Sequence, residues 1–159
     1  MMEKETVKIK MREIVEASFS APSLKEAVLT LIKEQAKRSD FLFGRLASVH
    51  YQMFSENIKE AEQIATAVEL MMLAGDLLDD LVDQDGLETS WSNAPLAIFL
   101  HIVIGLLLLG QKAIADLPID DHKKVKAQSY ILSRLFQSLN GQHGNIWISH
   151  MIYKQKLSI

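Results

Sequence analysis

Aspartates on one side of a predicted helix are the residues of this sequence best placed to do chemistry. The segment "DLLDDLVDQD", residues 76–85, lies within text of helical periodicity. At 100° per residue, four of its five aspartates fall within an arc of about 100°: Asp76, Asp79, Asp80 and Asp83. Glu69 lies on the same face, about two turns earlier. The spacing therefore predicts a helix face made almost entirely of carboxylates.

Local energetics oppose such a face. Like charges at i,i+4 destabilise a helix by roughly 0.2–0.5 kcal/mol per pair, and Asp76/Asp80 and Asp79/Asp83 are two such pairs. Negative charge near a helix C-terminus also opposes the helix dipole. No Lys or Arg occurs between Lys59 and Lys112. A partner from outside the local sequence must therefore offset the charge.

A divalent cation is the partner that the spacing favours. Mg²⁺ typically takes one or two protein carboxylates and completes its shell with water and substrate phosphates. The spacing does not match a calcium-binding EF-hand loop. We expect a Mg²⁺ site that holds a phosphate or diphosphate, with these candidate ligands: Asp76, Asp79, Asp80 and Asp83. A solvated surface with basic tertiary neighbours is the alternative.

Composition bounds the protein class. The 159 residues are 48% apolar and 23% charged, which is typical of one globular domain. The net charge of -3, without a basic stripe, argues against nucleic-acid binding. The absence of cysteine excludes disulfides and thiol catalysis. The charged N-terminus lacks the apolar core of a signal peptide, so we expect a cytoplasmic protein.

Helical periodicity recurs along the chain and predicts an all-α fold of about five helices. The predicted helices span residues 23–38, 41–54, 55–83, 93–117 and 119–155. Ser23 is the expected cap of the first, and Ser55 or Asn57 that of the third. A break is expected at Asn140-Gly141. We predict a single domain, 1–159, with residues 1–10 as a candidate disordered extension.

Residues 89–111 contain no Asp, Glu, Lys or Arg. Their apolar run is shorter than the roughly 20 residues that a membrane-spanning helix needs. We therefore expect a buried helix and no transmembrane span, with a membrane anchor as the alternative. His101 is expected to be a hydrogen-bonded core residue.

Two motifs resemble those of the trans-isoprenyl diphosphate synthases. "DDLVDQD" resembles the family's first aspartate-rich motif, with Asp79 and Asp80 as its leading pair. Asp83 and Asp85 both match its closing acid, so the resemblance adds Asp85 to the candidate metal ligands. "NGQHGN" resembles the family's GQxxD landmark, and Glu69 matches an upstream glutamate. The pattern is most similar to the ComQ branch, bacterial transferases that prenylate a tryptophan of a quorum-sensing pheromone peptide.

The resemblance implies a helical isoprenoid-synthase bundle and an Mg²⁺-dependent prenyltransferase. Mg²⁺ on Asp79, Asp80 and Asp83 would bind an allylic isoprenyl diphosphate, whose ionisation gives a carbocation. The double bond of isopentenyl diphosphate, or in the ComQ branch the indole of a pheromone peptide, would then accept the prenyl group. The resemblance also implies substrate-binding positions: Gln142, Arg45, His50, Ala74 and Gly75.

The chain departs from the family in ways that bear on activity. Asn145 stands in place of the aspartate of GQxxD, and the arginine pair after the first motif is absent. The chain matches only the N-terminal half of the family's domain, without the second aspartate-rich motif. We therefore expect this short chain alone to be inactive. The alternative is a non-catalytic homologue that acts as a helical interaction partner, as a homo-oligomer or with another chain.

Overall fold

The computed structural model describes residues 4–83 and 94–157, and for Asp83 and residues 149–157 it describes the backbone alone. The described part contains six α-helices and no strand, which confirms the all-α prediction. The helices are α1 (Lys4–Ser18), α2 (Pro22–Arg38), α3 (Leu42–Gln52), α4 (Ile58–Asp83), α5 (Leu96–Ala115) and α6 (Asp121–Leu157). They form two compact units, Met1–Pro118 and Ile119–Ile159, so α6 is described separately below.

The N-terminal helix is the element that the sequence analysis did not count. Val7, Met11 and Val15 recur every four residues of α1, and all three are fully buried. This spacing places them on one stripe of the helix, which packs against α2 and α4. Residues 4–10, considered above as a candidate disordered extension, belong to this helix.

The helix starts confirm one predicted cap and correct another. At α4, Asn57 Oδ1 accepts the Glu60 backbone N–H at 3.3 Å, and the Asn57 side-chain amide donates to Glu60 Oε1 at 2.8 Å. The Tyr51 hydroxyl also donates to Glu60. Asn57 is therefore the cap of α4. Ser23 does not cap α2, because the helix already begins at Pro22, after Ala21, and proline is well suited to a first helical position.

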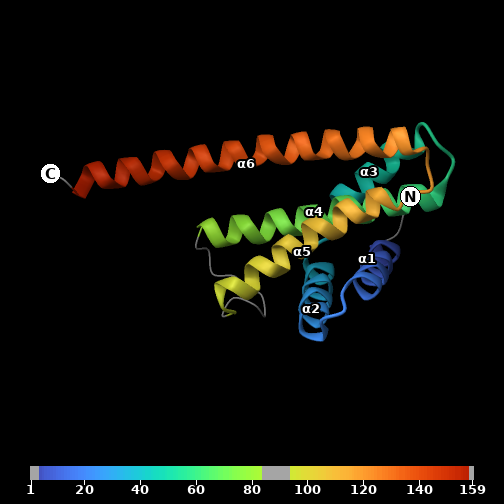
Figure 1. The fold of residues 1–159 in the computed structure, drawn as a ribbon, viewed down its shortest axis with the longest axis horizontal. Coiled ribbons are helices and arrows are strands. Elements are labelled where there is room, and N and C mark those ends of the chain that lie inside the picture. The colour runs from blue at the N-terminus through green and yellow to red at the C-terminus, as the bar shows by residue number, and fades with distance from the viewer. Residues whose placement is uncertain (1–3, 84–93, 158–159) are drawn as a thin grey trace. The chain divides into compact units, whose positions relative to one another are not determined.

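Helix α4 lies at the centre of the first unit and packs against α1, α3 and α5 (Figure 1). Its inward residues include Ala65, Leu70, Leu73, Ala74 and Leu77, which are buried in the main hydrophobic core. This packing fixes which face of α4 remains available for polar residues.

Two glycines let α5 approach its neighbours closely. A Cβ on Gly110 would lie 2.5 Å from Met71 Cγ and 3.0 Å from the Ala67 carbonyl oxygen, both on α4. A Cβ on Gly105 would lie 2.9 Å from Phe19 Cζ. These separations are shorter than van der Waals contact. The packing of α5 therefore requires glycine, which has no side chain, at both positions.

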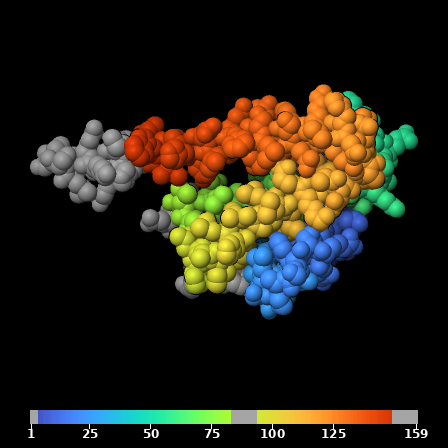
Figure 2. Space-filling model, viewed as in Figure 1, coloured from blue at the N-terminus to red at the C-terminus, as the bar shows by residue number. Residues whose placement is uncertain are grey.

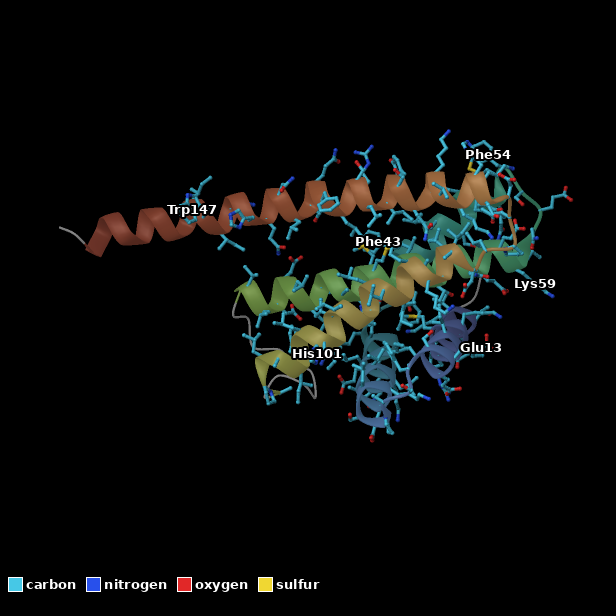
Figure 3. All side chains as sticks on the ribbon, viewed as in Figure 1. Glu13, Phe43, Phe54, Lys59, His101 and Trp147 are labelled. Atoms are coloured by element: carbon cyan, nitrogen blue, oxygen red, sulfur yellow. The ribbon has the colours of Figure 1, made fainter. Side chains whose placement is uncertain are left out.

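Helix α5 has one buried and one exposed apolar face. Phe99, Ile102, Leu106 and Leu109 are buried in the core, whereas the outer face carries four exposed residues at intervals of four: Leu96, Leu100, Ile104 and Leu108. Among the described helices, α5 alone is long and apolar enough to cross a membrane, and half of that segment is buried within the structure. One face of α5 is thus buried in the core, and the absence of a transmembrane span stays a prediction. His101 is exposed, so the prediction of a core histidine was wrong (Figure 3).

Helix α6 continues through Asn140-Gly141, where the sequence predicted a break. Glycine costs about 1 kcal/mol relative to alanine inside a helix, which a 37-residue helix can accommodate. The rings of His143 and Trp147 stack on this helix, with their centroids 6.4 Å apart.

The close contact of α4 and α5 can be tested with Gly110→Ala. We expect the variant to lose about 1–3 kcal/mol of unfolding free energy, because the new methyl group would meet Met71 and the Ala67 backbone. Urea denaturation measures this loss. Gly75→Ala is the control, since a Cβ there meets nothing within 4 Å. It should leave stability unchanged or raise it by up to about 1 kcal/mol through helix propensity. An unchanged stability for Gly110→Ala would contradict the packing.

Candidate functional site

The last two turns of α4 carry the acidic face. Asp76 and Asp79 are exposed and Asp80 is half-buried, while Leu73 and Leu77 are buried on the other side. The chain therefore presents these three carboxylates away from the core, as the periodicity predicted. The side chain of Asp83 and the whole of Asp85 lie outside the described residues, so the structure does not place them.

Helix α2 forms the other wall beside this face. A small pocket of about 50 Å³ is lined by Gln35 and Arg38 of α2 and by Asp76 and Asp80 of α4, with Leu31, Glu34, Leu73 and Leu77 completing the lining. The Gln35 side-chain amide donates to Asp76 Oδ2 at 3.5 Å. Arg38 is thus a basic tertiary neighbour of the kind that the local sequence lacks. It brings a positive charge to the pocket that Asp76 and Asp80 also line.

The carboxylates of Asp79 and Asp80 raise the proton affinity of Asp76. Although the Asp76 residue is exposed, the surrounding protein partly desolvates its carboxyl, which raises its pKa above the ordinary value. The negative charges of Asp80 and Asp79 raise that pKa further. A positive ion close to the three groups would relieve this repulsion.

Mg²⁺ is compatible with this set of donors. It binds hard oxygen ligands, and one or two carboxylates suffice when water and phosphate oxygens complete its shell. Asp76 and Asp80 are one turn apart and line the same pocket, so they provide such a pair. Within residues 4–83 and 94–157, no group of three or more His, Asp or Glu side chains is arranged to hold a metal ion.

Glu69 shares the helix face of the aspartates but has a different environment. Its side chain is 3% exposed, because α3 covers this part of α4. The Gly44 backbone N–H donates to Glu69 Oε1 at 2.6 Å, and the Phe43 backbone N–H also donates to this carboxylate. Glu69 therefore accepts hydrogen bonds from the first turn of α3, and sequence periodicity alone could not reveal this contact.

The start of α3 depends on this contact. Its N-cap residue, Phe41, has a left-handed backbone (φ 52°), and its side chain cannot accept a hydrogen bond. Glu69 supplies the acceptor that a Ser or Asp cap usually provides. A Cβ on Gly44 would lie 2.6 Å from Glu69 Cγ and 2.7 Å from the Ala65 carbonyl oxygen. Only glycine therefore allows α3 to lie this close to α4.

Burial sets the protonation behaviour of Glu69. Desolvation raises the pKa of its carboxyl above the ordinary value, the Gly44 N–H lowers it, and the charge of Asp76 raises it again. Because the net shift is upward, the folded state holds the Glu69 proton more tightly than the unfolded state does.

The remaining predicted site residues lie on three different helices. Arg45, which follows Gly44, is half-buried, and His50 is exposed with Nδ1 2.7 Å from the Leu46 carbonyl oxygen. On α4, Ala74 is fully buried in the core, whereas Gly75 faces open space. Gln142 lies on α6, in the second unit. The structure therefore brings together Asp76, Asp79 and Asp80, and it does not determine where Gln142 lies relative to them.

Comparison with known proteins identifies relatives of the chain. The chain is 34% identical over 138 residues to the tryptophan prenyltransferase ComQ of Bacillus subtilis subsp. natto (strain BEST195). It is 28% identical over 137 residues to the tryptophan prenyltransferase ComQ of Bacillus spizizenii. The predicted resemblance to the ComQ branch is confirmed. Each match covers 86% of this chain.

The matched region is less than half of each relative. It corresponds to 42% of the first ComQ protein and 47% of the second. No family model and no solved structure matches the chain. The comparisons therefore relate this chain to part of a prenyltransferase.

Sequence reasoning missed Gln35 and Arg38. Arg38 is in the last turn of α2, where a cation is favourable for any helix because of the helix dipole. Its position therefore gave no distinct signal. A contact with residues about forty positions later depends on how α2 and α4 pack.

The buried state of Glu69 predicts a pH dependence that Glu69→Gln should remove. With a raised folded pKa, Glu69 contributes stability that is fully present below its unfolded pKa and lost as pH rises through the folded pKa. Urea denaturation from pH 4 to 8 should therefore show the wild type losing stability relative to Glu69→Gln as pH rises. Glutamine keeps an oxygen that can accept the Gly44 N–H. Parallel pH profiles for the two proteins would contradict the shifted pKa.

Proposed function

We propose that this chain provides the acidic, diphosphate-binding wall of an Mg²⁺-dependent prenyltransferase. The observation that carries the proposal is the outward face of Asp76, Asp79 and Asp80 on α4, in a chain related to ComQ. The pocket beside it contains carboxylates as well as Arg38 and Gln35. Such a set of residues can bind a hydrated metal ion and a phosphate group together.

The proposed substrate is an allylic isoprenyl diphosphate. Asp79 and Asp80, with Asp76 beside them and Asp83 and Asp85 following in the sequence, would hold Mg²⁺ at this face. When bound, Mg²⁺ neutralises the charge that develops on a departing diphosphate. Arg38 can donate to phosphate oxygens in a forked, two-bond geometry. Gly75 leaves space on α4 beside the aspartates, where an apolar prenyl chain could lie.

The proposed acceptor follows from the relatives. Both ComQ proteins are described as tryptophan prenyltransferases, so we place the indole of a peptide tryptophan as the nucleophile. The peptide would be a quorum-sensing pheromone. Isoprenoid synthesis is the other reaction open to such a site. Because the matched region is less than half of each relative, we expect no turnover from this chain alone.

A second function is favoured by a separate observation. The outer face of α5 exposes Leu96, Leu100, Ile104 and Leu108 in a continuous row. An apolar row of this kind is suited to contact with another helix. A shortened homologue could thus act as a non-catalytic interaction partner, with a second copy or another chain covering α5. Light scattering would give a defined dimer or heteromer in this case and a monomer otherwise.

Asp80→Asn tests the metal-dependent site. We expect the variant to bind geranyl diphosphate in the presence of Mg²⁺ at least about tenfold more weakly than the wild type, because a carboxylate ligand is lost. Isothermal titration calorimetry measures the affinity with Mg²⁺ and with EDTA. Asp116→Asn, an exposed aspartate paired with Lys112 at 2.6 Å, is the control and should bind as the wild type does. Undiminished binding by Asp80→Asn would exclude this face as the metal site.

A further inference from the structure

The first two helices enclose a cleft that the proposed prenyltransferase site does not use. Its volume is about 570 Å³, within the range typical of small-molecule sites. One wall is α1, with Lys8 and Arg12, and the other is α2, with Lys25 and Lys33. The two helices pack against each other, and both are drawn in blue (Figures 1 and 2).

Positive charge dominates the cleft. Four cations line it and only one carboxylate does, that of Glu26. Residues 4–38 carry eight Lys or Arg and five Glu, in a chain whose overall net charge is -3. The charge is therefore separated along the sequence, with a basic N-terminal pair of helices and an acidic remainder.

The existing contacts of these cations leave them able to bind an anion. Lys8 pairs with Glu5 at 3.0 Å and Arg12 with Glu16 at 3.5 Å, and neither glutamate lines the cleft. Ion pairs at a protein surface contribute only about 0–1 kcal/mol, so a multivalent anion can compete with them. Lys33 makes no ion pair with any residue that the structure describes.

Partial charges of the backbone add to the positive electrostatic potential of the cleft. The start of α2 lines the cleft at Pro22, and its N-cap residue, Ala21, provides no side-chain acceptor. The N-terminus of α2, which is the positive end of its dipole, therefore lies at the edge of the cleft. Lys25 Nζ donates to the Glu16 carbonyl oxygen at 3.3 Å, which holds this ammonium group between the two helices.

The cleft also has an apolar part. Leu29 is half-buried and offers apolar surface to the cleft, whereas Ile32, which is also in the lining, has no exposed surface of its own. A ligand with a phosphate group and an apolar body would match both features. A purely hydrophilic anion would use only the cationic rim.

We propose that the cleft between α1 and α2 binds a phosphate-bearing anion through Lys8, Arg12, Lys25 and Lys33, without a metal ion. The cleft is separate from the acidic pocket on α4, because the two linings share no residue. The free phosphate of a small molecule and the headgroup of an anionic lipid offer the same chemistry.

The experiment compares two double variants with equal changes in charge. Lys8→Gln with Lys33→Gln removes one cation from each wall of the cleft. The control, Lys10→Gln with Lys37→Gln, removes one cation from α1 and one from α2 at positions that do not line the cleft. Lys8 and Lys10 are matched further, since each pairs with a glutamate three residues away, Glu5 and Glu13 respectively. Circular dichroism confirms that all the proteins are folded.

Isothermal titration calorimetry with inorganic pyrophosphate in EDTA provides the first readout. We expect the cleft variant to weaken binding at least about tenfold and the control to weaken it less than about twofold. Asp80→Asn should bind pyrophosphate in EDTA as the wild type does, which distinguishes this site from the Mg²⁺-dependent one. Absence of metal-free binding at the cleft would therefore not affect the conclusion about Mg²⁺-dependent binding at the acidic face, and the reverse also holds.

Sedimentation with phosphatidylglycerol vesicles, and with neutral phosphatidylcholine vesicles as a reference, provides the second readout. Cleft-dependent pyrophosphate binding supports a free phosphate ligand, and cleft-dependent binding to anionic vesicles alone supports a lipid headgroup. The proposal is overturned if the wild type binds neither probe, or if the two double variants lose binding equally.

Discussion

The packing of α4 against three other helices constrains the whole first unit. Its apolar residues contact α1, α3 and α5, and α5 comes within reach only because Gly110 has no side chain. Interiors are packed at nearly crystalline density, so a helix held on three sides cannot rotate without creating cavities or clashes. This constraint fixes the rotation of α4. Asp76, Asp79 and Asp80 must therefore point away from the core, where an ion or a phosphate can reach them.

The same rotation gives the carboxylates of one helix face two separate roles. Asp76, Asp79 and Asp80 are near solvent and repel one another, which suits them to bind a cation. Glu69, two turns earlier, is covered by α3 and accepts hydrogen bonds from its first turn. Burial by a neighbouring helix, rather than residue type, separates a structural carboxylate from the candidate ligands. Because Arg45 follows Gly44, the contact also fixes the start of the helix that carries Arg45.

Much of the fold could be predicted because helix formation follows local patterns. The apolar periodicity predicted the helices from α2 onwards, and Asn57 was correctly predicted as a cap because its side chain acts on nearby backbone groups. Errors arose where tertiary packing overrides local preference. His101 interrupts an apolar run and was expected in the core, but it lies on the outer face of α5. Gly141 was expected to end a helix, yet α6 continues through it.

The sequence by itself determined the helical class, the acidic face of α4 and the resemblance to ComQ, because each depends on local spacing or on short motifs that can be recognised without knowing how the helices pack. Only the tertiary structure decided which charges meet. It placed Arg38 and Gln35 beside Asp76 and Asp80, enclosed Glu69 against Gly44, and arranged four cations around one cleft between α1 and α2. These contacts join residues on separate helices. They depend on how the helices pack, which no local spacing of residues specifies.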